Sequence, residues 1–173
     1  MKLIQAMKKI KELQIKAEDL RSKVKQHCAD LDYETPPYGN NQADTIKGWI
    51  QAHSDVLKEI LALRMAIQRT NLATPVTIEL GGKGVTKTIA EWIHRRRDLA
   101  KADLAMYSGL TDRGLQEGRL PPTHAGGEER QVKIRRYFDP ETRDVAIELY
   151  RTEPTTIDST LEVINAVTDL IEE

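Results

Sequence analysis

Apolar residues recur at alternating spacings of three and four over the first thirty residues, which is the pattern of a long amphipathic helix. The repeat consists of Leu3, Ala6, Ile10, Leu13, Ala17, Leu20, Val24, His27 and Leu31. Two prolines and a glycine between positions 36 and 39 cannot continue a helix, so we expect it to end near Asp32. A single apolar stripe left in water would promote aggregation, and the helix therefore needs a partner.

The same spacing returns and predicts a second long helix that begins near Gln42 to Thr45 and ends around Asn71 to Thr74, before Pro75. Its repeat consists of Ile46, Trp49, His53, Val56, Ile60, Leu63, Ile67 and Thr70. Two long helices with a short connection are typical of an antiparallel hairpin with a coiled-coil-like seam. In that register we expect His27 to lie near Trp49 or His53, and the end of the second helix to lie beside the start of the chain.

Shorter elements follow the two helices. Residues 76–80 and 85–87 flank a glycine-rich turn and predict a β-hairpin. The Thr-Ile-Ala-Glu sequence at residues 88–91 has the spacing of a capping box and predicts the start of a third helix. A polar, glycine-rich stretch at residues 108–130 then predicts an exposed loop.

Two patterns near the end predict the last elements. Apolar residues alternate at 132–138 and at 145–149 around an Asp-Pro-Glu-Thr turn, which indicates a second β-hairpin. Periodic apolar positions after Pro154 predict a final helix.

The elements together predict a mainly α fold: a long antiparallel coiled-coil-like helical hairpin, two further helices and two small β-hairpins. The length of 173 residues suits one helical domain. Its expected parts are residues 1–74 (helical hairpin), 75–107 (β-hairpin and third helix), 108–130 (polar loop) and 131–173 (β-hairpin and C-terminal helix).

Composition narrows the classes of function. The chain has 26 Lys and Arg against 27 Asp and Glu, so its net charge gives no attraction to nucleic acid or to a membrane surface. A single cysteine, Cys28, excludes an intramolecular disulfide and a multi-cysteine zinc site. Charges interrupt every apolar run, which argues against a signal peptide and a membrane span. We therefore expect a cytoplasmic protein without a cofactor, a metal or a membrane partner.

A polar cluster at the end of the second helix is the first candidate site. Arg69, Thr70 and Asn71, close to Thr74, supply donors and acceptors where apolar residues would pack more easily. One interpretation is a polar ligand pocket. The alternative is a C-terminal cap, because Asn tolerates the left-handed conformation and Arg suits the negative end of a helix.

An arginine-rich stretch in the third helix is the second candidate. Arg95, Arg96, Arg97 and Asp98 are consecutive, so at most two of these side chains reach any one site. An inward guanidinium could bind a phosphate or a carboxylate with its bidentate fork. Exposed charges with one ion pair to Asp103 or to a neighbouring helix are the alternative.

No set of residues suggests catalysis. The four histidines lack the spacing of metal ligands, and no serine or cysteine lies in the setting of an activated nucleophile. Lys133, Arg135, Arg136 and Arg143, together with Tyr137, give a weak indication of nucleic-acid binding. Nearby acidic residues favour cross-strand ion pairs instead: Glu141, Asp144 and Glu148.

Three stretches carry a resemblance to a known family. They are Met1-Lys2-Leu3 at the start of the long helix, Ile67-Gln68-Arg69-Thr70-Asn71-Leu72-Ala73-Thr74 at the end of the second helix, and Thr88-Ile89-Ala90-Glu91 before the arginine-rich helix. This part of the chain, residues 1–105, resembles the septicolysin-like family of bacterial and phage helical proteins. The Arg-Asp pair expected of the family matches either Arg96, with Arg97 in place of the acid, or Arg97 and Asp98 one residue on. The resemblance implies an elongated helical-hairpin oligomer.

The leading hypothesis is a non-catalytic homo-oligomer that binds a small anionic, nucleotide-derived ligand. The expected ligand-binding residues are Arg69, Thr70, Asn71, Thr74, Arg96 and Arg97. If the source is a phage, as the resemblance allows, sequestration of a host defence signal in the host cytoplasm would fit. The first alternative is a structural or scaffolding oligomer without a ligand. A nucleic-acid binder is the second, and the near-neutral net charge makes it the weaker one.

Overall fold

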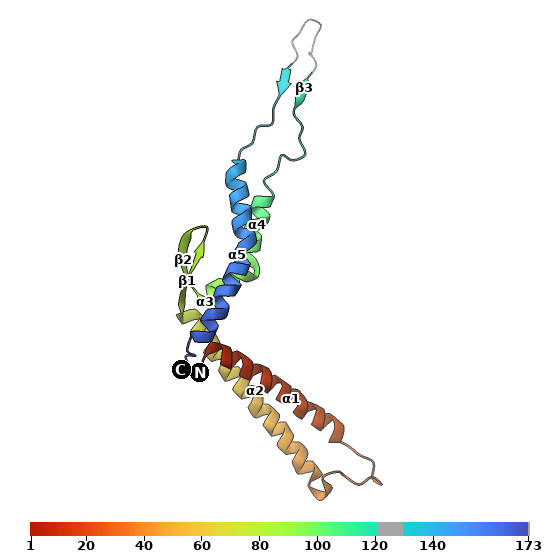
Figure 1. The fold of residues 1–173 in the computed structure, drawn as a ribbon. Helices are drawn as coiled ribbons and strands as arrows, with labels where there is room; N and C mark the ends of the chain where they lie inside the picture. Colours follow the sequence, from red (N-terminus) through yellow and green to blue (C-terminus); the bar gives the residue numbers. More distant parts are fainter. Residues whose placement is uncertain (121–129, 173) are drawn as a thin grey trace. The chain divides into compact units, whose positions relative to one another are not determined.

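The computed structural model describes residues 1–120 and 130–172 and confirms a mainly helical fold with two small antiparallel sheets (Figure 1). Contacts within the chain divide it into two compact units. The first unit consists of Met1–Val76, Thr88–Ala90 and Thr160–Glu173, and the second unit consists of Thr77–Lys87 and Glu91–Ser159. Among the described residues, no helix combines the length and the apolar character that a membrane crossing requires.

A helical hairpin forms most of the first unit. Helix α1 (Leu3–His27) packs along helix α2 (Gln42–Ala73), and a short 3₁₀ turn (η1, Gly39–Asn41) precedes α2. The buried core joins both helices through Ile10, Leu13, Ala17, Leu20, Val56 and Ile60. The predicted seam is therefore confirmed, and the His27 ring lies 5.8 Å from the Trp49 ring, as expected.

Helix α1 ends at His27 and not near Asp32. The N–H of Leu31 donates to the Glu34 carboxylate at 2.9 Å instead of continuing the helix, and the Leu31 side chain is exposed. The periodicity extended the helix too far because a single exposed leucine happened to fit the spacing.

The C-terminal segment pairs with the start of the chain in the first unit. The N–H of Leu3 donates to the Thr168 carbonyl at 3.0 Å, and the N–H of Leu170 donates to the Met1 carbonyl at 2.7 Å. The Lys2 ammonium lies 2.8 Å from the Asp169 carboxylate, and this contact lowers the pKa of Asp169. The two termini therefore lie side by side (Figure 1).

The first predicted β-hairpin is confirmed. Strands β1 (Pro75–Leu80) and β2 (Lys83–Thr88) form a two-stranded sheet. The turn residues Gly81 and Gly82 have φ values of 55° and 76°, which a side chain at either position would disfavour.

A continuous helical stretch follows β2. Helix α3 (Ile89–His94) leads into a π-helical turn (η2, Arg95–Leu99) and then into helix α4 (Ala100–Ser108). The arginine run that interrupts the apolar pattern therefore coincides with the π turn. Such turns are uncommon and are frequent at functional sites.

The second hairpin lies elsewhere than predicted. Strands β3 (Gly118–Leu120) and β4 (Arg130–Val132) pair antiparallel, with Gly118 opposite Val132, within and just after the stretch predicted as a loop. Residues 121–129 of that predicted loop lie outside the described residues. The predicted hairpin across residues 132–149 is wrong, because one long helix, α5 (Pro140–Val167), occupies residues 140–167.

The Asp-Pro-Glu-Thr sequence starts this helix instead of forming a turn. The Asp139 carboxylate accepts the Thr142 N–H at 2.9 Å and the Thr142 hydroxyl at 2.5 Å, which lowers the pKa of Asp139. An aspartate that caps the first turn, followed by proline at the first helical position, favours a helix start. Helix α5 then continues through Pro154, where the predicted helix was expected to begin.

Candidate functional site

Two of the predicted site residues tie the C-terminal segment to the end of α2 in the first unit. Thr70 is fully buried; its hydroxyl donates to the Ala66 carbonyl at 2.8 Å and accepts the Ile171 N–H at 2.9 Å. Arg69 donates from Nη1 to the Glu172 carbonyl at 3.0 Å. Both side chains therefore bind backbone groups of the same unit.

Thr74 and Asn71 lie at the same helix end. Thr74 is the C-cap of α2: its N–H donates to the Thr70 carbonyl at 3.0 Å, and its own carbonyl accepts the Ile89 N–H at 3.0 Å. The Asn71 side chain is buried, and its Oδ1 accepts no hydrogen bond from any residue of the described ranges. The C-cap is therefore Thr74 and not Asn71, which lies inside α2 without a positive φ and keeps an unused acceptor.

The other two predicted residues, Arg96 and Arg97, lie on η2 in the second unit. Arg96 forms an ion pair with Asp158, while Arg97 donates from Nε to Asp98 at 3.0 Å and from Nη2 to Nδ1 of His94 at 3.1 Å. Because arginine carries no acceptor, this contact places the ring proton of neutral His94 on Nε2. Predicted site residues are thus grouped as four at the end of α2 and two on η2, each group in its own unit.

Arg95 is the most deeply buried of the three consecutive arginines, and it forms ion pairs with two acidic residues. Its Nε and Nη2 donate to the two carboxylate oxygens of Glu153 at 2.5 and 3.0 Å, and its Nη1 lies 2.6 Å from the Asp103 carboxylate. The guanidinium also lies 5.3 Å from the centre of the Tyr150 ring. The Glu153 hydrogen bond raises the pKa of Arg95 further above its ordinary value, and burial raises the pKa of Tyr150.

The Glu153 side chain is only 2% exposed, so this pair lies in a desolvated setting. A buried ion pair is stable only when hydrogen bonds satisfy both partners, and the bidentate geometry supplies them. The network fixes η2 and α4 against α5 within the second unit.

A hollow of about 420 Å³ opens beside η2, and we call it the η2 hollow. It is lined by Lys87, Glu91, His94, Arg95 and Leu99. Lys87 lies near the end of strand β2, and it forms no ion pair with any residue that the structure describes. The volume is in the range of small-molecule sites, and the lining brings basic side chains from β2, α3 and η2 to one place.

Sequence reasoning did not select Lys87, His94, Arg95 or Glu153 as site residues. A signal for Glu153 was present, because it lies four and eight residues before Ile157 and Leu161, which are buried on the same helix. A charge within such an apolar stripe indicates a buried partner of opposite sign. No comparable signal identified Lys87, since its place at the hollow depends on the fold.

The part of the chain that the structure describes contains no group of three or more His, Cys, Asp or Glu side chains placed to hold a metal ion. Comparison with known proteins adds no assignment: no protein-family model, curated protein or solved structure matches the chain. The resemblance to the septicolysin-like family stays a prediction from the residues that carry it.

Proposed function

We propose that this protein is a non-catalytic, homo-oligomeric binding protein for a small anionic, nucleotide-derived ligand that it takes up in the η2 hollow. The observation that carries the proposal is the hollow itself, whose wall contains a lysine without an ion-pair partner among the described residues. Lys87 supplies the positive charge that an incoming phosphate would meet, because the charge of Arg95 is already matched by Glu153 and Asp103.

Donors beside Lys87 support the same ligand class. His94 lines the hollow, and its contact with Arg97 leaves Nε2 as a hydrogen-bond donor. Arg97 does not line the hollow itself but contacts His94, which does; its side chain is 62% exposed, and its Nη1 group has no hydrogen bond or ion pair with a residue that the structure describes. Phosphate and carboxylate oxygens are the acceptors that such a set of donors recognises.

The fixed position of η2 supports binding without a large rearrangement. Arg95 is held by Glu153 and Asp103, so the neighbouring wall of the hollow is already in place. Preorganised donors lose less side-chain entropy when a ligand binds.

Titration calorimetry with a panel of cyclic nucleotides, cyclic dinucleotides and ADP-ribose tests this proposal. We expect at least one compound to bind, and we expect Lys87→Gln and Arg97→Gln each to weaken its binding about tenfold, since each removes a charge-assisted hydrogen bond. Arg151→Gln is the matched control, because Arg151 is an exposed arginine of the same unit whose ion pair among the described residues is with Glu148, one turn away. No heat with any compound, or equal affinity in all variants, would overturn the proposal.

The oligomeric part of the proposal is supported by an apolar stripe on α2. Five large side chains on one face of this helix are between 44% and 65% exposed, and we call them the α2 stripe: Ile50, Leu57, Leu61, Met65 and Leu72. They lie outside the seam with α1, so the hairpin leaves a second apolar face in water. Such a face is typical of helices that pair with another chain.

The spacing of the α2 stripe favours a second copy of this chain as the partner. Successive members are seven, four, four and seven residues apart, so the stripe is the same from either end. A two-fold axis at Leu61 would place Ile50 against Leu72 and Leu57 against Met65 of the other copy. Self-complementary faces of this kind form isologous dimers.

Sedimentation velocity tests the pairing. We expect the wild-type chain to form a dimer or a multiple of it, and Leu57→Glu/Leu61→Glu to raise the dissociation constant at least a hundredfold, because two charges per chain would be desolvated at the interface. Ile15→Glu is the matched control, since Ile15 is 71% exposed on α1 and lies off the α2 stripe. A monomeric wild type, or equal weakening by Ile15→Glu, would contradict this part of the proposal.

The scaffolding alternative predicts a different result in these experiments. An oligomer that binds none of the nucleotides, and whose assembly is weakened by Arg69→Ala or Arg96→Ala, would favour a structural role over a binding protein. The proposal expects Arg69→Ala to act on stability alone, because Arg69 holds the backbone of Glu172.

A further inference from the structure

A basic two-stranded arm, which the proposed function does not use, extends past the ends of α4 and α5 in the second unit (Figure 1). We define the arm as residues 109–120 and 130–138. These residues contain six basic side chains, Arg113, Arg119, Arg130, Lys133, Arg135 and Arg136, and two acidic ones, Asp112 and Glu117. Residues 121–129, which lie between the two parts, add Glu128 and Glu129, so the charge of the whole stretch stays positive.

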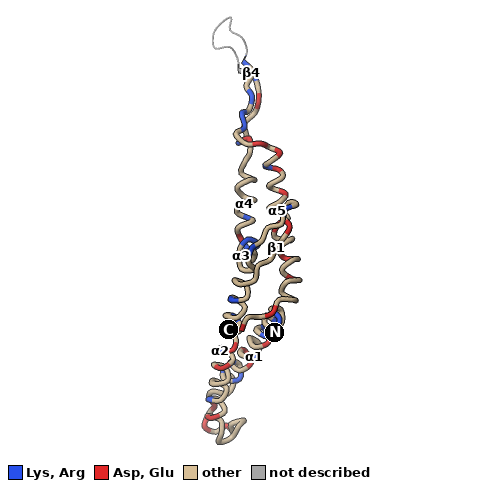
Figure 2. Tube along the Cα trace, turned by 90° about the vertical axis from the view of Figure 1, so that its left-hand side faces the viewer, with Lys and Arg blue, Asp and Glu red and all other residues tan. Residues whose placement is uncertain are grey.

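Among the described residues, the structure does not form the cross-strand ion pairs that the sequence favoured for these basic residues. Cross-strand pairing with Glu141, Asp144 and Glu148 would have neutralised the basic residues, but these acids lie on α5 and not on a strand opposite residues 132–138. Within the arm, the Arg136 guanidinium donates two hydrogen bonds of 2.6 Å to the Asp112 carboxylate, so these two charges match each other. The basic residues of the arm appear in blue around β4 (Figure 2).

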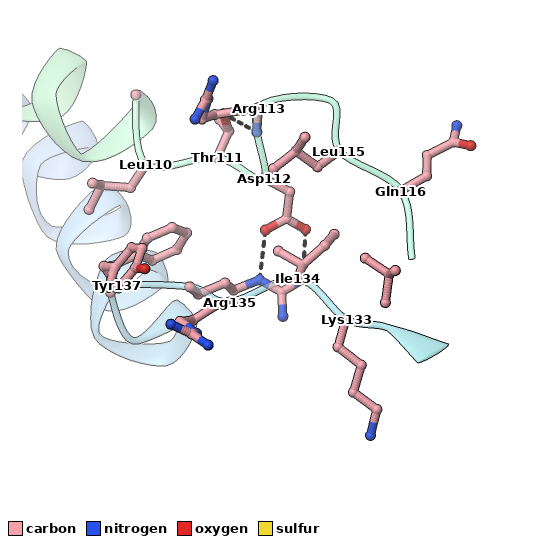
Figure 3. A pocket seen from close by; sticks show the side chains of 14 residues that line it. Leu110, Thr111, Asp112, Arg113, Leu115, Gln116, Lys133, Ile134, Arg135 and Tyr137 are labelled. Carbon is pink, nitrogen blue, oxygen red and sulfur yellow. Dashed lines mark hydrogen bonds and ion pairs between the residues drawn. The ribbon is translucent and has the colours of Figure 1, made fainter. Parts of the chain in front are cut away.

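Exposure alternates along the segment that leads out of β4. Val132 and Ile134 are half-buried and line a hollow of about 550 Å³, while Lys133 and Arg135 are exposed. The Ile134 N–H donates to the Glu117 carboxylate at 3.1 Å, which ties this segment to the opposite one. Figure 3 shows the Lys133 side chain extending away from the facing segment with Asp112, although both Lys133 and Arg135 are among the residues that line the hollow. Neither forms an ion pair with a described residue.

An exposed aromatic side chain accompanies the two cations. Tyr137 is 88% exposed, two residues after Arg135. The hollow beside it is lined by apolar side chains such as Leu110, Leu115 and Phe138, with the Asp112–Arg136 pair across it (Figure 3). Cations along an extended backbone together with an exposed ring are the elements of single-strand recognition, in which phosphates meet the cations and a base stacks on the ring.

We infer that the arm binds single-stranded nucleic acid, with Lys133 and Arg135 on successive phosphates and Tyr137 stacked on a base. An unpaired strand fits better than a duplex, because only an unstacked base can lie against the Tyr137 ring or enter the hollow. The chain as a whole is nearly neutral, because acidic residues elsewhere in the sequence balance the positive charge of the arm. This inference uses residues other than those of the η2 hollow, so the failure of one proposal would not contradict the other.

Fluorescence anisotropy with a labelled single-stranded oligonucleotide tests the arm over a series of salt concentrations. For two phosphate contacts we expect the logarithm of the association constant to fall with the logarithm of salt at a slope of about −1.4. Lys133→Gln/Arg135→Gln should bring this slope close to zero. Lys11→Gln/Lys16→Gln is the matched control, because it removes two exposed lysines from α1 and should leave the slope unchanged.

Two further comparisons separate stacking from charge attraction. Tyr137→Ala should weaken oligonucleotide binding about tenfold and leave binding of inorganic polyphosphate, which has no bases, unchanged. Tyr137→Phe should retain the affinity. The inference is overturned if no oligonucleotide binds at low salt, if the α1 control reduces the slope as much as the arm variant, or if vesicles with phosphatidylserine bind more tightly than the oligonucleotide.

Discussion

Arg95→Met should lower the free energy of unfolding by about 3–5 kcal/mol, because it leaves Glu153 as a charge without a partner in a desolvated position. Glu153 is 2% exposed and accepts both of its bidentate hydrogen bonds from Arg95. Asp103 would lose the same partner, but its greater exposure lets water replace the contact. Urea denaturation followed by far-ultraviolet circular dichroism measures the change.

Two controls separate the buried pair from loss of an arginine as such. Arg97→Met removes a 62% exposed side chain from the same turn and should change the stability by less than about 1 kcal/mol. The double variant Arg95→Met/Glu153→Leu should recover most of the lost stability, because no buried charge remains. Equal effects of Arg95→Met and Arg97→Met would refute this description of the pair.

Pro154→Ala should have the opposite effect on stability and raise the free energy of unfolding by about 1–3 kcal/mol. Pro154 lies inside α5, where it provides no N–H for the Tyr150 carbonyl one turn earlier. Alanine would restore that hydrogen bond and has the highest helix propensity. Thermal unfolding followed by circular dichroism should show a higher midpoint for the variant.

Thr155→Ala is the matched control for this prediction, because it places alanine at the next, exposed position of α5 without adding a backbone hydrogen bond. Its expected gain is a few tenths of a kcal/mol. If Pro154→Ala is no more stable than Thr155→Ala, the helix has already compensated for the proline. The missing backbone hydrogen bond then does not destabilise the protein as we propose.

Pro154 also shows why the C-terminal third of the fold was predicted incorrectly. Valine, isoleucine and leucine at 145, 147 and 149 alternate as in a strand, and proline after them argues against a continuous helix. In the structure, Glu153 and Ile157 are buried on either side of Pro154, and their packing holds the helix through it. Tertiary packing therefore overrides a local preference. The aspartate–proline helix start at Asp139 was present in the sequence and was interpreted as a turn.

The N-terminal hairpin was predictable because its signal is long and redundant. Many seam positions repeat one spacing, so a single misleading residue, Leu31, shifted only the end of α1. The same holds for the first β-hairpin, whose two glycines occupy positive-φ positions.

The candidate site was predictable only in part. The arginine run marked η2, because charges interrupt an apolar pattern there, but the sequence could not show which arginine is buried. That depends on Glu153, 58 residues further along the chain. Lys87 likewise becomes part of the η2 hollow only when β2 and α3 are in place.

Histidine ring resonances in a proton–carbon NMR spectrum of the full chain, titrated with ADP-ribose and with inorganic pyrophosphate, test ligand uptake in the η2 hollow most directly. The chain has four histidines, and His94 is the one in the wall of this hollow. We expect its resonance, assigned with His94→Gln, to shift while those of His27 and His53 stay in place. Unchanged histidine signals at saturating ligand, or shifts confined to His27 and His53, would contradict the account.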